Sequence, residues 1–540
     1  MTQTDVPDYA DFYENFDRAV LDDLLQGSLS EGINVCVECC DRHADSNKPA
    51  LIWEAADGTG GSLSFAELQR ESAKFANLLK AEGIGPGDRV SGLLPRTPEL
   101  VAVILGTFRA GAVYQPLFTA FGPKAIEHRL NVSGSKMVVT DDANRDKLVD
   151  LPNCPKVAST GTARDGDIDF HAAMAEASDS FDPVMRTGDD HFLMMSTSGT
   201  TGAPKGVNVP INALPSFAAY MKYGIGLRTD DRYWNIADPG WAYGLYYAVT
   251  GPLMLGCTTT LIDGPFSVDR TCETIVKHGI NNLAGAPTAY RVMIAEGDKV
   301  PNAIRGRLRV ASSAGEPLNP EVMRWFDEQL DCPLHDHYGQ TEVAMVLNNH
   351  HDLKHPVRPG TAGLPMPGYA LAVVDETGAP VPDGEPGILA VDHTKSALFY
   401  FEGYAGREGE DWVGDYYLTG DSVEQNADGS YAFVGRNDDL ISSAGYRIGP
   451  FDVESCLIEH ASVLESAVVG KPDAERGHIV KAFVVLKEGF AASDALSEEL
   501  RLHVRGRLGA HAYPREIDFV EGLPKTPSGK IQRFLLREGK

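Results

Sequence analysis

Short apolar segments alternate with helical segments over the first part of this chain, and this alternation restricts its fold most. Residues 62–84 carry apolar side chains near helical spacing and end at Gly83, and residues 99–112 repeat the pattern. Residues 89–95 and 136–140 are short and apolar, as buried strands are. Strands that alternate with helices of this length form parallel sheets, so the sequence predicts α/β layering.

The pattern changes after about residue 365. Short apolar runs separated by Gly-containing turns then predict a small antiparallel barrel or sheet, with strands at 373–375, 388–392 and 431–434. Beyond residue 436, helices are expected at 451–459 and 497–508 and strands at 467–470 and 480–486. A chain of 540 residues is also too long for one core. We therefore predict α/β combined with α+β: a large N-terminal domain, 1–436, of layered α/β subdomains and a small antiparallel barrel, and a small C-terminal α+β domain, 437–540.

The charge balance limits the class of partner. The formal net charge is −28, which argues against nucleic acid or an anionic membrane as the main partner. Residues 1–22 show no secretory pattern. Residues 239–262 carry no charge but contain several glycines and Pro252, which favours a buried strand-turn-helix over a membrane span. We therefore expect a cytoplasmic protein without a membrane span.

Two groups of metal-ligating residue types invite a metal interpretation. Cys36, Cys39 and Cys40 lack a second ligand pair at zinc-like spacing, so they are interpreted as buried helix cysteines. The histidine-rich run at 349–355 is expected to be a solvated loop.

The most distinctive local pattern lies at residues 194–206, Met-Met-Ser-Thr-Ser-Gly-Thr-Thr-Gly-Ala-Pro-Lys-Gly. Small and hydroxylated residues expose backbone N–H groups and hydroxyls, and Lys205 adds a cation, as a triphosphate requires. The run is not the P-loop of kinases and GTPases, because no Ser or Thr follows Lys205. The alternative is a flexible Gly/Thr surface loop.

This run resembles the signature of the adenylate-forming superfamily, which includes acyl-CoA synthetases, adenylation domains of peptide synthetases and luciferases. Four further segments resemble the same family in the same order: Gly-Glu-Pro at 315–317, Tyr-Gly-Gln-Thr-Glu at 338–342, Tyr-Leu-Thr-Gly-Asp at 417–421 continuing through 435–447, and Pro-Lys-Thr-Pro-Ser-Gly-Lys at 524–530. The resemblance covers nearly the whole chain. It implies that a carboxylic acid and ATP form an acyl-adenylate and pyrophosphate, and that the acyl group then passes to a thiol.

The resemblance also implies roles for individual residues. Thr341 is expected to bond the α-phosphate, Glu342 to hold Mg²⁺, Asp421 to accept the ribose hydroxyls, and Arg436 to close over the sugar. The implied ATP- or AMP-binding residues are Thr197, Ser198, Gly199, Thr200, Thr201, Gly202, Gly315, Glu316, Pro317, Asp336, His337, Tyr338, Gln340, Thr341, Asp421 and Arg436.

The expected catalytic residues are Lys205, Thr341, Glu342 and Lys530. Lys530 should bridge the carboxylate and the α-phosphate, although such a lysine is ordinarily a solvated tail charge. The C-terminal domain is expected to be a mobile lid that rotates about Asp438. That rotation would bring Gly445, Tyr446 and Arg447 to the coenzyme A tunnel. The alternative for Gly445 is a turn glycine.

Residues 237–244 and 251–256 resemble acetyl-CoA and medium-chain acyl-CoA synthetases, which implies coenzyme A as the acceptor. In acetate-specific members a tryptophan fills the position of Gly339, so the pocket floor is expected to be open here. Each buried CH₂ is worth about 0.8 kcal/mol, which favours an acid larger than acetate. The expected acyl-pocket residues are Trp241, Ala242, Tyr243, Gly315 and Gly339. Propionate, medium-chain and cyclic acids all stay open.

We therefore predict an AMP-forming acid–thiol ligase that uses ATP, coenzyme A, a small carboxylic acid and Mg²⁺. The sequence leaves homo-oligomer formation open. Three alternatives remain: an adenylating enzyme that serves a carrier-protein phosphopantetheine, a luciferase-like oxidative homologue, and a catalytically silent nucleotide-binding homologue. The last is disfavoured because the polar residues named above are all present.

Overall fold

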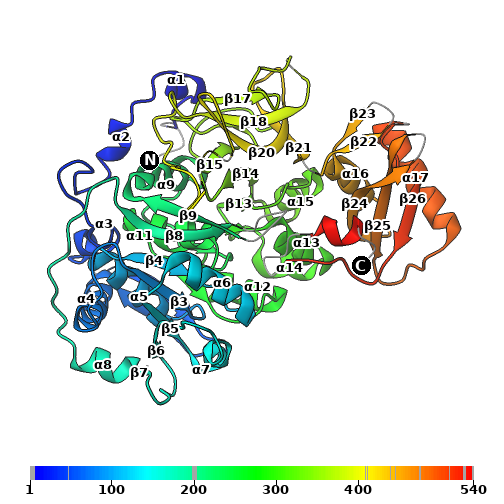
Figure 1. Ribbon diagram of the computed structural model, residues 1–540. Helices are drawn as coiled ribbons and strands as arrows, with labels where there is room; N and C mark the ends of the chain where they lie inside the picture. Colours follow the sequence, from blue (N-terminus) through cyan, green and yellow to red (C-terminus); the bar gives the residue numbers. More distant parts are fainter. Residues whose placement is uncertain are drawn as a thin grey trace.

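A computed structural model describes residues 6–46, 48–197, 204–382, 384–407, 409, 411–437, 439–443, 446–473, 476–509, 511–526 and 531–537. Figure 1 shows a large body on one side and a smaller C-terminal unit, drawn in orange and red, on the other. The fold combines layered α/β sheets with small antiparallel sheets, as predicted.

The first sheet of the body has the strand order β7-β6-β5-β3-β4-β8-β9 and is parallel except for the last pair. Its strands are β3 (Arg89–Leu93), β4 (Val113–Pro116), β5 (Met137–Thr140), β6 (Lys156–Ser159), β7 (Ile168–Asp169), β8 (His191–Thr197) and β9 (Lys205–Pro210). The accompanying helices are α4 (Phe65–Ala81), α5 (Pro98–Arg109), α6 (Pro123–Ser133), α7 (Asp142–Arg145), η2 (Asp146–Leu148) and α8 (Phe170–Glu176). The strands and helices predicted between residues 62 and 140 are confirmed here.

The second sheet has the order β16-β15-β14-β13-β12-β10-β11-β1-β2 and is parallel from β1 to β14. Its strands are β1 (Pro49–Glu54), β2 (Gly60–Ser64), β10 (Tyr233–Asn235), β11 (Thr259–Ile262), β12 (Asn282–Gly285), β13 (Val310–Ala314), β14 (Leu334–Gln340), β15 (Ala344–Asn348) and β16 (Leu364–Pro365). The helices after β11 are α12 (Val268–His278), α13 (Pro287–Ala295), α14 (Lys299–Ile304) and α15 (Pro320–Leu330). Parallel strands end at a common edge, so the segments that follow β12, β13 and β14 gather there.

Shorter helices complete the body. They are α1 (Tyr9–Glu14), α2 (Ala19–Asp22), α3 (Val35–Cys39), η1 (Asp41–His43), η3 (Ile211–Ala213), α9 (Leu214–Ala219), η4 (Tyr220–Gly224), α10 (Ala242–Gly244), η5 (Leu245–Thr250) and α11 (Gly251–Met254). The third sheet is the predicted antiparallel one, with β17 (Leu371–Val374), β18 (Gly387–Asp392), β19 (Trp412–Val413), β20 (Tyr416–Gln425) and β21 (Tyr431–Arg436).

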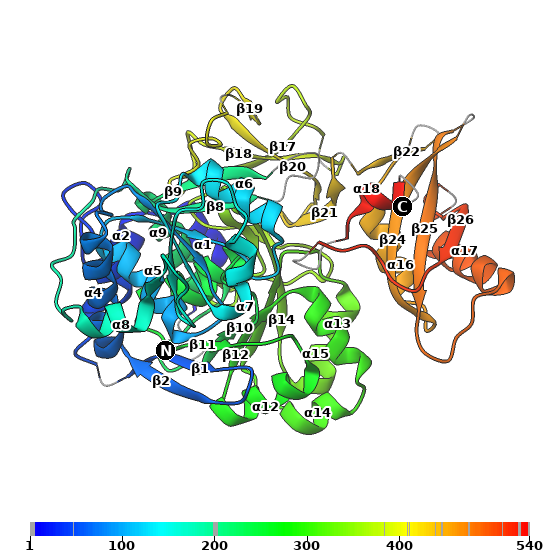
Figure 2. The same cartoon turned by 60° about the horizontal axis from the view of Figure 1, so that its bottom comes forward.

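The C-terminal unit is α+β with its own core, which includes Val453, Leu457, Val484 and Leu500. Its strands are β22 (Ile441–Ser443), β23 (Tyr446–Ile448), β24 (Val463–Asp473), β25 (Gly477–Leu486) and β26 (Glu516–Phe519), and its helices are α16 (Pro450–Ile458), α17 (Asp494–Leu508) and α18 (Arg533–Arg537). Figure 2 shows that β21 and β22 lie where the two units meet. The domain boundary after residue 436 stays a prediction.

Local signals explain where individual elements begin. The Ser64 hydroxyl accepts from the Glu67 N–H, and the Glu67 carboxylate accepts from the Ser64 N–H, so α4 begins with a capping box. Helix α4 therefore starts three residues later than the predicted 62, because 60–64 form β2. Gly83, with φ +72°, follows the helix in a backbone conformation that glycine adopts at little cost.

Residues 239–262 are buried, but in the opposite order to the prediction. The helical elements α10, η5 and α11 come first, and strand β11 follows them. An apolar run buried on all sides has no periodicity that orders helix and strand. In the described part of the chain, no helix is long and apolar enough to cross a membrane. The cysteine prediction is confirmed, since Cys36, Cys39 and Cys40 are free and buried.

The solvated-loop prediction for residues 349–355 is wrong. His350 is 2% exposed, and the His351 ring stacks on His335 with the centroids 3.9 Å apart. The N-terminal helix α1 covers this run, because Tyr9 stacks on His350 and its N–H donates to the Lys354 carbonyl at 3.1 Å. Burial lowers the pKa of both His350 and His351 well below its usual range.

Candidate active site

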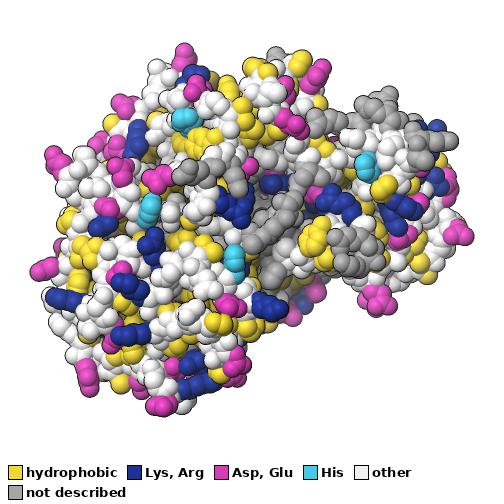
Figure 3. Space-filling view, viewed as in Figure 1, with side chains coloured by type: hydrophobic (Ala, Val, Ile, Leu, Met, Phe, Trp, Pro, Cys, Tyr) yellow, Lys and Arg dark blue, Asp and Glu magenta, His cyan; other side chains and the backbone are white. Residues whose placement is uncertain are grey.

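A cavity of about 1380 Å³ lies between the body and the C-terminal unit. The residues that line it come from the ends of β8, β13 and β14, from β20 and β21, and from the C-terminal segment around 525–533. Figure 3 shows Lys and Arg side chains gathered where the two units meet, although acidic side chains are spread over this face. The cavity lining carries both carboxylates and Lys or Arg side chains, and Lys205, Arg436, Lys525 and Arg533 are the cations that could hold an anionic ligand there.

Both ends of the predicted phosphate loop lie at the cavity. Thr197 and Lys205 are paired in the β8–β9 hairpin, and both line the cavity wall. The Lys205 ammonium lies 3.3 Å from Asp411 Oδ2 and 4.2 Å from the ring centroid of Tyr404. Ser198, Gly199, Thr200, Thr201 and Gly202 lie outside the described residues. The hairpin thus carries the loop's two ends to the same wall.

Asp421 is the centre of a polar network that joins the second and third sheets. Its Oδ2 accepts hydrogen bonds from the Tyr338 hydroxyl at 2.5 Å and from Gln340 Nε2 at 2.8 Å, and its Oδ1 accepts from Arg436 Nη1 at 3.1 Å. Asp421 and Arg436 face each other because β20 and β21 pair at that register. These four predicted nucleotide residues are therefore brought together from three strands.

Thr341 and Glu342 follow β14 at its carboxyl end and also line the cavity. The Thr341 carbonyl accepts from the Tyr400 hydroxyl at 2.8 Å and from the Tyr246 hydroxyl at 3.3 Å, which holds this turn in place. Glu342 is 6% exposed, and its Oε1 accepts from the Tyr404 hydroxyl at 2.9 Å. Burial raises the pKa of Glu342, so a nearby cation would favour its ionised form.

The segment after β13 forms another wall. Gly315 has φ +96°, and nothing lies within 4 Å of where its Cβ would be, so a ligand can approach the backbone there. The Glu316 carboxylate accepts from the Thr288 hydroxyl at 3.0 Å and from Arg291 Nη2 at 3.0 Å. Pro317, Asp336 and His337 line the same region. Burial raises the pKa of Asp336 well above its usual range and lowers that of His337 to about 3.

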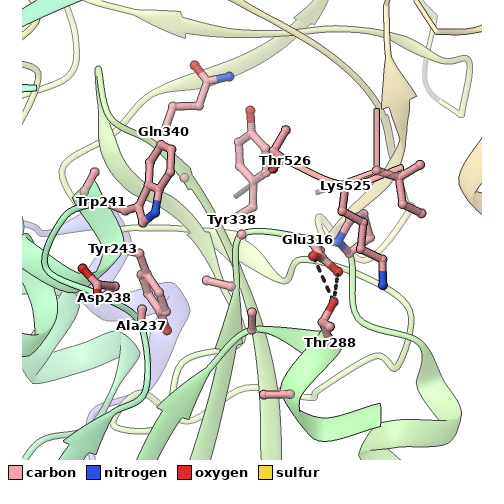
Figure 4. Close-up of a pocket in the computed structure, with 18 of the residues that line it drawn as sticks. Ala237, Asp238, Trp241, Tyr243, Thr288, Glu316, Tyr338, Gln340, Lys525 and Thr526 are labelled. Atoms are coloured by element: carbon pink, nitrogen blue, oxygen red, sulfur yellow. Dashed lines mark hydrogen bonds between the residues drawn. The ribbon is translucent and has the colours of Figure 1, made fainter. Parts of the chain in front are cut away.

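Aromatic residues form the opposite wall. Figure 4 shows Trp241 and Tyr243 on one side of the cavity and Thr288, Glu316, Lys525 and Thr526 on the other. Trp241 packs against Phe118 and Phe121, with ring centroids 5.6 and 5.3 Å away. Other residues on the aromatic side are Ala242, Tyr246, Tyr247 and Met345. This wall suits an apolar acyl group.

Gly339 lines the cavity, as predicted for an acyl-pocket residue, but the space beside it is not empty. A Cβ at Gly339 would lie 2.1 Å from the Ala344 carbonyl oxygen and 2.7 Å from Met345 Sδ. The β14–β15 register shifts next to Gly339, and Ala344 has φ +59°, so the bulge turns this position toward β15. Met345 therefore occupies the space beside Gly339.

The C-terminal unit supplies part of the cavity wall. Lys525 and Ile531 form a β-bridge, and the Gln532 N–H donates to the Pro524 carbonyl at 2.9 Å. Thr526 and Ile531, on either side of 527–530, both line the cavity. Lys530 itself lies outside the described residues.

The remaining predicted positions belong to the hinge and the tunnel. Asp438 and Gly445 lie outside the described residues, and only the backbone of Tyr446 and Arg447, in β23, is described. Among the described residues that line the cavity, none comes from β22 or β23.

Sequence reasoning missed several residues that line the cavity, namely Thr288, Arg291, Met345, Tyr404 and Asp411, and Tyr220, which lies behind the cavity wall. Apart from Met345, which lies three residues beyond the 338–342 motif, they lie far along the chain from the residues that they contact. Only the folded arrangement brings them together.

Residues 39–404 match the family described as AMP-binding enzyme, and residues 452–530 match the AMP-binding enzyme C-terminal domain. The acetyl-coenzyme A synthetase of Bacillus subtilis (strain 168) is 37% identical over 541 residues, which cover 98% of this chain and 94% of that protein. The crystal structure of Brucella canis acyl-CoA synthetase is 57% identical and covers 99% of both chains with a TM-score of 0.81. An anthranilate CoA ligase in complex with anthranoyl-AMP is 27% identical, covers 94% of this chain and 97% of its own, and gives a TM-score of 0.86.

Proposed function

This chain belongs to the AMP-binding enzyme family, and from that premise we propose that its cavity joins a carboxylic acid to AMP and then to coenzyme A. The chain is an ATP-dependent acyl-CoA synthetase, an AMP-forming acid–thiol ligase like the relatives that it matches along nearly its whole length. One observation carries the assignment of this reaction to the cavity. The Lys205 cation, the Asp421–Arg436 pair and the Thr341–Glu342 turn surround one space that also has an aromatic wall.

The first half-reaction needs positioned cations, because the acid and ATP are both anions. The acid's carboxylate oxygen attacks the α-phosphorus, the bond to the β-phosphate oxygen breaks, and pyrophosphate leaves. Lys205 and Lys530 would neutralise charge at the phosphates, and Thr341 would donate to the α-phosphate. Asp421 would accept both ribose hydroxyls, with Arg436 held beside it. The thiol of coenzyme A then attacks the acyl carbon and AMP leaves.

A magnesium ion fits the donor chemistry at Glu342. This carboxylate is buried and has one oxygen held by Tyr404, so a hard cation would relieve the cost of burying its charge. When bound, Mg²⁺ would neutralise phosphate charge. Tyr404 also lies under Lys205, so it would keep the two charged groups of this wall in place.

Two half-reactions at one site require two positions of the C-terminal unit. The segment that carries Lys530 begins and returns at the cavity, whereas the described residues of the β22–β23 hairpin do not line it. This arrangement suits adenylate formation. We propose that rotation near Asp438 then exchanges Lys530 for Gly445, Tyr446 and Arg447 and opens the path for the thiol.

The aromatic wall supports an acid larger than acetate, and Met345 should limit its length. Met345→Ala removes a flexible side chain beside Gly339, and we expect kcat/KM for acids two or three carbons longer to rise about tenfold relative to short acids. Pyrophosphate release with linear acids of increasing length measures the change. Met293→Ala, which changes a buried methionine that does not line the cavity, is the matched control. An unchanged length profile in Met345→Ala would exclude this limit.

Pyrophosphate release across linear, branched and aromatic acids, with and without coenzyme A, tests the function itself. We expect release to depend on the acid and turnover to depend on coenzyme A, with AMP and a thioester as products. Purified protein that releases no pyrophosphate with any acid in the presence of Mg²⁺ would contradict the proposed function.

A further inference from the structure

A chain of hydrogen bonds runs from the aromatic wall of the cavity into the core. The Tyr243 hydroxyl lies 3.4 Å from the Tyr220 hydroxyl, and the Tyr220 hydroxyl lies 2.9 Å from His337 Nδ1. His337 Nε2 lies 3.2 Å from the carbonyl oxygen of Asn349. Tyr220 is buried behind the cavity wall, whereas Tyr243 and His337 both line the cavity. The cavity is thus connected to a backbone carbonyl by three side chains.

The backbone carbonyl of Asn349 determines which group donates in each hydrogen bond of this series. A carbonyl oxygen only accepts, so His337 Nε2 must carry a proton and donate to Asn349. Burial lowers the pKa of His337 to about 3, so its imidazole is neutral and has a single N–H. His337 Nδ1 is therefore an acceptor, and the Tyr220 hydroxyl donates its only proton to it.

The same reasoning determines which hydroxyl donates in the hydrogen bond at the cavity end. Since the Tyr220 proton is committed to His337, the Tyr220 oxygen can only accept from the Tyr243 hydroxyl. Within the described residues, Tyr220 is the hydrogen-bond partner of the Tyr243 hydroxyl. When the Tyr243 proton points inward, the lone pairs of its oxygen remain for a group in the cavity. Burial also raises the pKa of Tyr243, so the phenol stays neutral.

We propose that the acyl pocket selects an acid that carries a hydrogen-bond donor, a hydroxyl or an amino group, which is bound by the oxygen of Tyr243. This inference rests on the proposed function and names the class of acid. In Figure 4, Tyr243 and Trp241 lie across the cavity from Glu316 and Thr288, so the contact would lie away from Glu316, one of the predicted nucleotide residues. The surrounding wall of Trp241, Tyr246 and Met345 is largely apolar. Such a wall makes one polar contact decisive, because an unmatched buried oxygen is costly.

Trios of acids with equal carbon number test the proposal: the unsubstituted acid, the acid with a hydroxyl group, and the acid with a ketone at the same carbon. Pyrophosphate release gives kcat/KM for each acid. We expect the best hydroxy acid to exceed its ketone partner by about five- to tenfold, since a ketone offers no proton to the Tyr243 oxygen.

Variants of the two tyrosines make the test specific. In Tyr243→Phe, the ratio of kcat/KM for the hydroxy acid to kcat/KM for its ketone partner should fall toward one. In Tyr220→Phe the Tyr243 proton loses its inward acceptor and can turn to the cavity, so the preference should shift toward the keto acid. Tyr223→Phe is the matched control, because it lies on the same helix η4, does not line the cavity, and should keep the wild-type ratio.

The outcomes separate this inference from the proposed function. Acid-dependent pyrophosphate release with no hydroxy preference at any chain length would overturn the inference and leave the function standing. A wild-type ratio in Tyr243→Phe would also overturn it, and this variant changes a residue at the cavity surface rather than in the core. Absence of release with every acid would instead contradict the function.

Discussion

Lys530→Ala is expected to lower the rate of adenylate formation by about 10²–10³-fold, because one preorganised cation at a developing charge contributes on that scale. The two substrates are anions, and Lys530 is proposed to lie between the attacking carboxylate and the α-phosphate. Its flanking residues Thr526 and Ile531 line the cavity. ATP–pyrophosphate exchange measures this half-reaction directly.

The second half-reaction is the internal control. Thioester formation from supplied acyl-AMP and coenzyme A should be unchanged in Lys530→Ala, because no phosphate anhydride is formed in that step. Lys471→Ala, which removes an exposed lysine paired with Glu516 outside the cavity, should leave both half-reactions at the wild-type rate. Equal loss of both half-reactions in Lys530→Ala would refute the proposed role.

Asp421→Ala is expected to reduce kcat/KM for ATP by roughly 10²-fold, mainly through a higher KM. A hydrogen bond to a charged group contributes about 1.5–3 kcal/mol, and Asp421 is proposed to accept two from the ribose. The substitution also leaves Tyr338, Gln340 and Arg436 without their shared acceptor. Initial rates at varied ATP concentration give the two constants.

A control is needed because Asp421 also joins two sheets. Asp392 is similarly buried, belongs to the same sheet as Asp421 and accepts from Thr394 and Lys395, but it does not line the cavity. Asp392→Ala should therefore keep the KM for ATP even if its melting temperature falls. A wild-type KM in a folded Asp421→Ala enzyme would show that the ribose is held elsewhere.

The nucleotide side of the site could be predicted well from the sequence, because each motif is local and its described residues lie on a strand or next to one. The structure brings Lys205, Asp421 and Thr341 to one cavity, although their chemical roles stay predictions. The predicted strands of the antiparallel sheet and the helices of the C-terminal unit are also present. These elements show clear periodicity and turn residues over short distances.

The acyl side could not be predicted in the same way, because contacts between distant segments decide it. Gly339 faces β15 because the pairing of β14 with β15 contains a bulge, and no residue type in 338–342 predicts that bulge. Within residues 349–355, Asn349, His350 and Leu353 are buried, and helix α1, more than 300 residues earlier, packs on this run. Tyr220 and His337 are 117 residues apart, and their hydrogen bond exists only in the folded chain.

Strand β14 contributes residues to both proposed substrate regions, that of ATP and that of the acid. Tyr338 and Gln340 donate to Asp421, while the intervening Gly339 faces Met345 on β15. A mutation on β14 that adapted the enzyme to another acid would therefore also disturb the hydrogen bonds to Asp421, the proposed acceptor for the ribose of ATP. Laboratory evolution toward a new acid should leave β14 intact and accumulate its changes on β15, at positions such as Met345 that do not contact Asp421.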